Sequence, residues 1–263
     1  MIAAANKIAL VDCLSAAGFR RIEVASFVSP KRVPQMADGA EVLAGIRRAA
    51  GVSYAALVPN LMGFERAMAA RADEVAIFAS ASEGFSRANL NCSIAESLER
   101  FRSVAEAAAA AGVPMRGYVS CVVECPYDGP VAPEAVAAVT AALIAMGAYE
   151  VSLGDTIGRA VPARVGAMLD AVLDVVEPAR LAGHFHDTGG RALDNVEVAL
   201  GRGLRVFDAA AGGLGGCPFA PGAAGNVATE ALEDRLRALG FGTGLDRAVL
   251  ARAAEMARAM RHG

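Results

Sequence analysis

The chain has 263 residues, with 25 Lys and Arg against 28 Asp and Glu, a formal net charge of −3 and 55% hydrophobic residues. This length suits one large α/β domain, and the near-balanced charge excludes the basic surface that neutralises nucleic-acid phosphates. No run approaches the roughly 18 uninterrupted apolar residues of a membrane-spanning helix, so neither nucleic acid nor a membrane is an expected partner.

The chain begins with a predicted helix, in which Ile8, Val11 and Leu14 share one face and Gly18 marks the C-terminal stop. After it, short β-rich runs alternate with longer alanine-rich helical stretches. The predicted strands are 21–27, 53–58, 74–78, 115–121, 149–153, 181–186 and 206–210. The predicted helices are 34–49, 60–70, 94–111, 133–146, 162–175, 191–202, 226–239 and 245–260.

Strands that alternate with helices of this length predict βα units on a parallel sheet, and eight such units in about 250 residues make a (β/α)8, or TIM, barrel. The sequence has seven strand signals and starts with a helix, so the first strand is missing. We therefore expect a single α/β domain over residues 1–263, a TIM-type barrel that is incomplete at its N-terminus. Because seven parallel strands cannot close with the standard tilt, either the front of the sequence is truncated or another segment covers the gap.

The five cysteines are an odd number, and Cys121 and Cys125 have no matching second pair. Neither a disulfide framework nor a zinc ribbon is therefore expected. Cys13, Cys92, Cys121 and Cys125 are interpreted first as structural residues, and the chain is expected to work in a reducing, cytoplasmic setting.

Two of the three histidines occur in the tetrapeptide His184-Phe185-His186-Asp187, at the end of a predicted strand. Residues two apart in a strand point to the same face about 6–7 Å apart, which allows two imidazoles to bind one metal ion. The carboxyl end of a barrel strand is also where barrel enzymes hold their active sites. The alternative is a pair of histidines whose rings are satisfied by neighbouring side chains.

Six glycines occur among the fifteen residues from Gly212 to Asn226, after the last predicted strand. Such a loop is expected where movement or a close backbone approach is needed. Cys217 lies in its middle, and a thiol on an exposed glycine loop suits a proton donor or a nucleophile. Asn226 has two interpretations: it can cap a helix that begins at Val227, or its side-chain oxygen can face a metal.

Three acidic residues lie in or after predicted strands. Glu23 is a charge inside an apolar strand, which requires a partner or a catalytic role, and Asp155 follows another strand. For both residues, structural and functional roles stay open on this reasoning. Asp208 is expected to form a structural ion pair inside the barrel. The basic loop with Lys31 and Arg32 either meets an anionic substrate or is simply solvated.

Six motifs in or beside the predicted strands and loops follow one another along the chain: Ser26-Phe27-Val28-Ser29-Pro30-Lys31, Asn89-Leu90-Asn91-Cys92-Ser93, Arg116-Gly117-Tyr118-Val119-Ser120-Cys121, Ser152-Leu153-Gly154-Asp155-Thr156-Ile157-Gly158, His184-Phe185-His186-Asp187-Thr188, and Gly215-Gly216-Cys217-Pro218 through Asn226 to Glu230. Together they resemble the hydroxymethylglutaryl-CoA lyases, which belong to a superfamily of barrel metallolyases that also includes isopropylmalate and homocitrate synthases. The match is ordered and spans almost the whole chain. The relatives share the paired histidines, whereas the Gly-Gly-Cys-Pro loop is similar to that of the lyase branch.

The resemblance implies cleavage of 3-hydroxy-3-methylglutaryl-CoA to acetyl-CoA and acetoacetate, assisted by Mg²⁺ or Mn²⁺. It also implies an acyl-CoA as the small-molecule partner, a homo-oligomer, namely a dimer, and a role in leucine breakdown and ketone-body formation. By the same resemblance, the metal ligands are His184, His186 and Asn226. The resemblance makes Cys217 the acid on the loop, with Glu23, Asp155 and Glu230 as supporting polar residues of the catalytic group. The residues that it places toward the acyl-CoA are Asn89, Ser93 and Tyr118.

The chemistry of this cleavage agrees with the residues present. A base must remove the proton of the tertiary hydroxyl group, and either His184 or Asp155 can do so, directly or through water. A divalent ion lowers the pKa of that hydroxyl and orients the substrate. An acid must then protonate the departing enolate carbon, and a loop thiol suits this step once water is excluded.

The sequence departs from the family pattern at its start. In this family the first strand ends in a motif of Arg-Asp-Gly-Leu-Gln type, whose Asp is a metal ligand and whose Arg neutralises the developing enolate. The chain starts just after that point, so we expect this form to be impaired, by roughly 100- to 1000-fold for the lost cation alone. A misplaced start codon is the leading explanation. The alternatives are a lyase or condensing enzyme for another 3-hydroxyacyl-CoA or a 2-oxo acid on the same scaffold, and a catalytically inert homologue.

Overall fold

The structure, a computed structural model, describes residues 1–215 and 225–261. Within these residues, seven strands form one sheet in the order β1-β2-β3-β4-β7-β8-β9, and β5 pairs with β6 in a separate two-stranded sheet. The pairs β1–β2, β2–β3, β4–β7, β7–β8 and β8–β9 are parallel, and helices connect successive strands. This α/β, TIM-type architecture is the predicted one, and the described residues supply seven of the eight strands of a complete barrel.

The chain divides into two compact units, one made of Met1–Ala76, Ala210–Leu214 and Ala228–Gly263, and the other of Ile77–Ala209 and Gly215–Val227. The single domain expected over residues 1–263 stays a prediction. The elements that begin in the first unit are α1 (Ala4–Ser15), β1 (Arg21–Ser26), the 3-10 helix η1 (Pro34–Met36), α2 (Gly39–Gly45), β2 (Ser53–Leu57), α3 (Leu61–Ala69), β3 (Glu74–Ser80), the 3-10 helix η3 (Ala211–Gly213), α9 (Thr229–Ala238) and α10 (Arg247–Arg261).

In the first unit, α1 packs against α10, as the apolar face of the N-terminal helix predicts. Leu10 on α1 belongs to one buried cluster with Ala253 and Ala257 on α10. The helix ends at Ser15, and Gly18 then has a φ of 95°, in the left-handed region that favours glycine. The predicted stop at Gly18 is thus confirmed within a few residues.

The stretch predicted as one helix over 34–49 is divided into two pieces, so that prediction is wrong. η1 covers Pro34–Met36, and α2 covers only Gly39–Gly45. A Cβ atom on Gly45 would lie 2.5 Å from Cδ1 of Ile8 in α1. A larger residue at the position where α2 ends would therefore displace the end of the Ile8 side chain.

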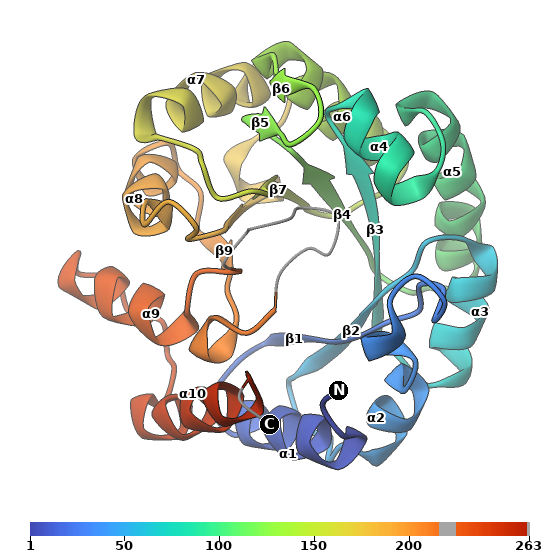
Figure 1. Ribbon diagram of the computed structural model, residues 1–263, viewed down its shortest axis with the longest axis vertical. Coiled ribbons are helices and arrows are strands. Elements are labelled where there is room, and N and C mark those ends of the chain that lie inside the picture. The colour runs from blue at the N-terminus through green and yellow to red at the C-terminus, as the bar shows by residue number, and fades with distance from the viewer. Residues whose placement is uncertain (216–224, 262–263) are drawn as a thin grey trace. The chain divides into compact units, whose positions relative to one another are not determined.

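The second unit carries most of the sheet and its helices (Figure 1). Helices α6, α7 and α8 follow one another beside β4, β7 and β8, and each packs against its neighbour. After the end of β3, the elements are α4 (Glu83–Leu90), α5 (Ile94–Ala111), β4 (Met115–Ser120), β5 (Glu124–Cys125), β6 (Gly129–Pro130), α6 (Pro133–Ala145), β7 (Val151–Asp155), α7 (Pro162–Leu173), the 3-10 helix η2 (Pro178–Arg180), β8 (Leu181–Phe185), α8 (Ala192–Gly201) and β9 (Val206–Asp208).

Local signals explain why these helices start and end where they do. Ser93 and Glu96 form a capping box at the start of α5, and Gly112 closes the helix with a φ of 65°. Pro133 and Pro162 occupy the first positions of α6 and α7, where a missing N–H is tolerated. Such caps are visible in the sequence, so the predicted boundaries of these helices lie within two residues of the observed ones.

Helix α4 and the β5–β6 pair were not predicted. The eight residues of α4 carry only two large apolar side chains, Phe85 and Leu90, so no helical periodicity is visible. Its start is nevertheless marked by Ser82, whose hydroxyl accepts a hydrogen bond from the N–H of Phe85. This capping serine is the signal that could have revealed the helix.

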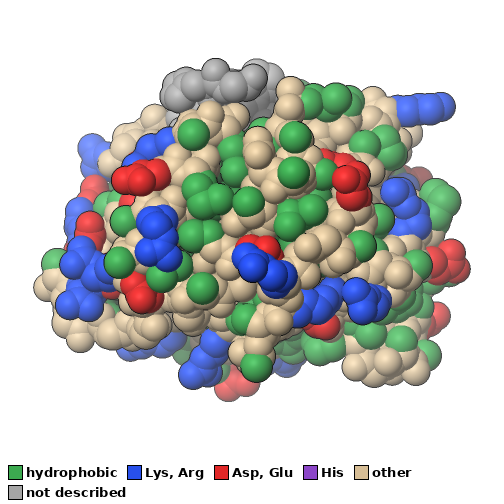
Figure 2. Space-filling view, turned by 90° about the horizontal axis from the view of Figure 1, so that it is seen from below, with side chains coloured by type: hydrophobic (Ala, Val, Ile, Leu, Met, Phe, Trp, Pro, Cys, Tyr) green, Lys and Arg blue, Asp and Glu red, His purple; other side chains and the backbone are tan. Residues whose placement is uncertain are grey.

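Charged side chains of both signs are intermixed with apolar ones on the face shown in Figure 2. Among the described residues, no helix combines the length and the apolar character that a membrane crossing demands.

Candidate active site

His184 and His186 converge at the carboxyl end of β8, as their spacing predicts. Nε2 of His184 lies 3.4 Å from Nε2 of His186, and the ring centroids are 5.4 Å apart. Two ligands that each lie about 2.1 Å from one ion and bind at adjacent positions are roughly 3.0–3.4 Å apart. The two ring nitrogens therefore have the separation that one shared metal ion requires.

The ring of His186 is available as a neutral ligand. His186 is only 6% exposed, and burial, followed by the neighbouring His184, lowers its pKa to about 4 against a smaller opposing effect from the backbone of Thr156. A neutral imidazole keeps a lone pair for a metal, whereas a protonated ring has none. His186 thus suits a divalent cation at neutral pH.

Asn226 lies beside His186 because the two residues form an antiparallel backbone bridge. Helix α9 begins only at Thr229, and its N-cap position is held by Ala228. The interpretation of Asn226 as the cap of this helix is therefore wrong, and the helix predicted from residue 226 starts three residues later. The side-chain amide of Asn226 also lies close to Gly215, since a Cβ atom on Gly215 would lie 3.5 Å from Asn226 Nδ2.

The donor set around the histidines fits a hard divalent cation of the Mg²⁺ or Mn²⁺ type when Asn226 is included. Within residues 1–215 and 225–261, no group of three or more His, Cys, Asp and Glu side chains could hold a metal ion. An amide oxygen, such as the one that Asn226 carries, is a donor that such cations accept.

Asp155 ends β7 next to β8, where its Cα is paired with that of Phe185. Its carboxylate accepts hydrogen bonds from the N–H groups of Ala160 at 2.9 Å and Arg159 at 3.4 Å. Burial raises its pKa above the ordinary value, and these backbone bonds oppose the rise. Asp155 therefore shapes the loop after β7 and has an increased proton affinity, which suits a general base.

Glu23 and Glu230 belong to the first unit. Glu23 is exposed on β1, and its role as a supporting polar residue stays a prediction. Glu230 lies in the first turn of α9, accepts a hydrogen bond from the N–H of Gly212 and pairs with Arg258. Glu230 thereby holds the start of the glycine-rich segment to the start of α9.

Of the three residues assigned to the acyl-CoA, Tyr118 lies beside the histidines. Its ring meets that of His184 edge-on, with centroids 6.1 Å apart and planes at 89°. Asn89 lies on α4, and Ser93 is the N-cap of α5, with its hydroxyl accepting from the N–H of Glu96. The hydroxyl of Ser93 thus has a structural role in capping. Cys217 and the centre of the glycine-rich loop lie outside the described residues.

A buried ion-pair network next to the histidines went unnoticed in the sequence. Arg116, only 3% exposed in its side chain, lies between Glu150 and Asp208, with N–O distances of 2.8 and 2.9 Å. Asp208 was expected in a structural ion pair, which is confirmed, but its partner was not identified. One signal in the sequence could have revealed the network. Each of three apolar strands has one charged residue in it or beside it, namely Arg116, Glu150 and Asp208.

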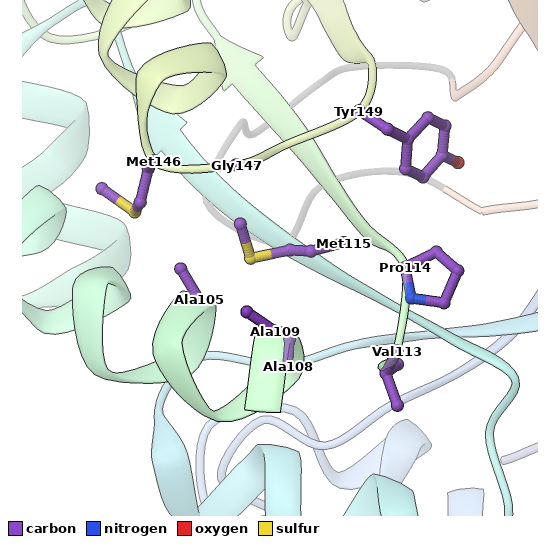
Figure 3. A pocket seen from close by; sticks show the side chains of 9 residues that line it. All are labelled: Ala105, Ala108, Ala109, Val113, Pro114, Met115, Met146, Gly147 and Tyr149. Carbon is purple, nitrogen blue, oxygen red and sulfur yellow. The ribbon is translucent and has the colours of Figure 1, made fainter. Parts of the chain in front are cut away.

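A cavity of about 220 Å³ lies elsewhere in the second unit (Figure 3). Alanines of α5 line it, together with Met115 at the start of β4 and Met146 and Tyr149 before β7. It therefore opens at the amino ends of β4 and β7, whereas His184 and His186 lie at the carboxyl end of β8. Its apolar lining carries no group for the chemistry considered above.

Comparisons with known proteins agree along almost the whole chain. The HMGL-like family model matches residues 1–257. The chain is 57% identical over 245 residues to the 3-hydroxy-3-isohexenylglutaryl-CoA/hydroxy-methylglutaryl-CoA lyase of Pseudomonas aeruginosa, which covers 93% of this chain and 82% of the relative. It is 55% identical over 240 residues to the mitochondrial hydroxymethylglutaryl-CoA lyase of Bos taurus, with 91% and 74% covered.

Solved structures give the same result. The crystal structure of the HMG-CoA lyase from Brucella melitensis matches with a TM-score of 0.98 at 62% identity, covering 100% of this chain and 93% of that one. The HMG-CoA lyase from Bacillus subtilis matches with a TM-score of 0.95 at 44% identity, covering 99% of this chain and 88% of that one. The chain belongs to the HMGL-like family and, within it, to the hydroxymethylglutaryl-CoA lyases.

Proposed function

We propose that the protein cleaves 3-hydroxy-3-methylglutaryl-CoA to acetyl-CoA and acetoacetate. The observation that carries this proposal is the convergence of His184 and His186, with Nε2 atoms 3.4 Å apart and Asn226 bridged to His186, in a chain 57% identical to such a lyase. The arrangement offers two imidazole nitrogens and one amide oxygen as donors. These donors carry no negative charge, so they would bind one divalent cation without neutralising its positive charge.

A divalent ion, Mg²⁺ or Mn²⁺, would be held by His184, His186 and Asn226, and would supply the positive charge that lowers the pKa of the substrate hydroxyl. The hydroxyl proton at C3 leaves to a base, for which His184 and Asp155 are the candidates. Burial raises the pKa of Asp155 above its ordinary value, which increases the proton affinity of its carboxylate.

Loss of that proton lets the oxygen lone pair form the carbonyl group of acetoacetate. The bonding pair of the C2–C3 bond then passes to C2 and gives the enolate of acetyl-CoA. Cys217 is proposed to return a proton to C2, which completes acetyl-CoA and balances the reaction. Glu23 and Glu230 are proposed as supporting polar residues, and Asn89, Ser93 and Tyr118 as contacts of the acyl-CoA.

Product analysis tests this function. The 263-residue chain, and a chain completed at its N-terminus by a first strand of the Arg-Asp-Gly-Leu-Gln type, are incubated with 3-hydroxy-3-methylglutaryl-CoA and Mg²⁺ or Mn²⁺. Acetoacetate and acetyl-CoA are expected in equal amounts, and they should disappear when a chelator removes the metal. Absence of acetoacetate from both chains would exclude the lyase function.

A second substrate is favoured by the name of one relative, which acts on 3-hydroxy-3-isohexenylglutaryl-CoA as well. We therefore propose a panel of 3-hydroxyglutaryl thioesters that differ in the alkyl group at C3. A ratio of kcat/KM values that favours the methyl compound supports a dedicated hydroxymethylglutaryl-CoA lyase. The reverse ratio would assign the longer acyl chain as the substrate.

We also propose a cytoplasmic dimer that acts in leucine breakdown and ketone-body formation, as the resemblance implies. The curated relatives include a cytoplasmic enzyme of Mus musculus as well as mitochondrial ones. Light scattering after size-exclusion chromatography measures the assembly, and a mass of one chain would exclude the dimer.

A further inference from the structure

Asp208 is the residue at which the buried ion-pair network of the second unit meets the histidine pair. Asp208 on β9 and His184 on β8 are directly paired neighbours in the sheet, so their side chains leave the sheet on the same face. Oδ2 of Asp208 lies 3.2 Å from Nδ1 of His184. Asp208 therefore contacts the ring nitrogen that does not face His186.

Two further side chains, Ser152 and Arg116, fix the carboxylate of Asp208. Ser152 on β7 donates a hydrogen bond of 2.6 Å to Oδ2, and Nη1 of Arg116 on β4 donates one of 3.0 Å to the same oxygen. Nη2 of Arg116 lies 2.9 Å from Oδ1, and its Nε donates to Glu150 at 2.8 Å. With both oxygens engaged by a guanidinium group that is itself held, the carboxylate cannot rotate away from His184 without breaking these contacts.

The protonation of His184 follows from this arrangement. Oδ2 of Asp208 accepts hydrogen bonds from Ser152 and Arg116, and Oδ1 faces Nη2 of Arg116, so the carboxylate is an acceptor toward these partners. An ionised carboxylate has only acceptor atoms, so the hydrogen atom between the two residues belongs to Nδ1 of His184. In the neutral ring, Nε2 then carries the lone pair, and this is the atom that lies 3.4 Å from Nε2 of His186.

We propose that Asp208 is a positioning residue for His184: it holds the proton on Nδ1 and so presents the Nε2 lone pair to the divalent metal. This inference rests on the proposed function for the identity of the bound group. The network of Arg116, Ser152 and Glu150 then serves to aim a metal ligand as well as to stabilise the sheet. Removal of such a partner commonly weakens metal binding by about 10- to 100-fold.

The first test is the metal affinity of Asp208→Ala, measured with Mn²⁺ by electron paramagnetic resonance of the free ion. This substitution removes the acceptor beside Nδ1 of His184, so the ring proton is no longer held on that nitrogen. We expect Mn²⁺ binding to weaken by about 10- to 100-fold. The matched control is Asp170→Ala, which breaks a surface ion pair with Arg202 in the same unit and should leave Mn²⁺ binding within about twofold.

The second test uses no metal and no substrate. Nitrogen-15 NMR of the histidine rings in the metal-free protein reports which nitrogen carries the proton, and we expect Nδ1–H for His184 in the wild type and a larger share of Nε2–H in Asp208→Ala. Nε2–H in the wild type would overturn the proposal even if the variant does not fold. Unchanged Mn²⁺ affinity and an unchanged tautomer in a folded Asp208→Ala would overturn it as well. A wild type that shows Nδ1–H but binds no Mn²⁺ would instead refute the metal of the proposed function and leave the positioning of the ring standing.

Discussion

Nε2 of His184 faces Nε2 of His186 at 3.4 Å, and the backbone of His186 is bridged to that of Asn226. Two imidazole nitrogens at this separation can bind one cation. The first two predictions separate the residues that would hold this cation from the one that would move a proton.

His186→Ala should reduce the bound metal. The substitution removes one of two converging nitrogens, so the remaining ligands bind the ion more weakly. Metal analysis by mass spectrometry after dialysis against limiting Mn²⁺ measures the stoichiometry, and circular dichroism checks that the fold is kept. An unchanged stoichiometry in a folded His186→Ala would refute its role as a ligand.

Cys217→Ala should suppress turnover while leaving the metal content near that of the wild type. The thiol is assigned to protonation of the enolate, a role of a general acid that typically contributes about 10²- to 10⁴-fold in rate. Acetoacetate formation and metal stoichiometry are measured on the same preparation. Cys13→Ala, at a half-buried cysteine of α1, is the control and should keep full activity. Loss of metal together with activity would argue against the assignment.

Arg116→Met should strongly destabilise the fold. The substitution leaves the carboxylates of Glu150 and Asp208 without their shared cation, and breaking a buried pair in this way costs about 3–5 kcal/mol. Urea unfolding followed by circular dichroism gives the free energy. The control is Arg102→Met, whose partner Glu99 is exposed, and we expect a change there of about 1 kcal/mol or less. Equal effects of the two substitutions would contradict a structural role for the buried pair.

The stability of the protein should show opposite pH dependences at two aspartates. Because burial raises the pKa of Asp155 in the folded state, the folded chain holds a proton that the unfolded chain has lost above about pH 4. The contribution of Asp155 to stability therefore falls as the pH rises from about 4 toward its folded pKa. Asp155→Asn removes this fall. The free energy of unfolding of the variant should therefore increase relative to that of the wild type as the pH rises through that window.

Asp170 gives the matched comparison. Its hydrogen bond to Arg202 lowers its pKa, so its contribution is present above the unfolded pKa and is lost as the pH falls through the folded one. The free energy of unfolding of Asp170→Asn should therefore decrease relative to that of the wild type as the pH rises from about 3 to 5. Urea unfolding at a series of pH values measures both variants. Slopes of the same sign would show that the two carboxyls do not differ in this way.

Much of the fold could be predicted because the relevant signals are local. The alternation of β-rich runs with capped helices located the seven strands of the main sheet, and Pro133, Pro162 and Gly112 marked helix ends. The 3-10 turn at Pro34–Met36 and the short α2 were missed because Ile46 adopts an extended backbone, although its apolar side chain suits a continued helical pattern. Helix α4 was missed because it has too few apolar residues to show a period.

The site was predictable where strand geometry alone decides it. The spacing of His184 and His186 in one strand places both rings on one face, and the structure brings their Nε2 atoms together. The partner of Asp208 was not predictable in the same way, since Arg116 and Asp208 lie 92 residues apart and meet only through the order of the strands. Periodicity tells which face a side chain occupies, whereas strand order determines its neighbours.

The backbone bridge between His186 and Asn226, together with the close approach of Gly215 to the Asn226 amide, anchors the chain on both sides of residues 216–224. Because the two anchor points are adjacent, insertions or deletions between them need not displace either histidine, and loop closure becomes only slowly less favourable with length.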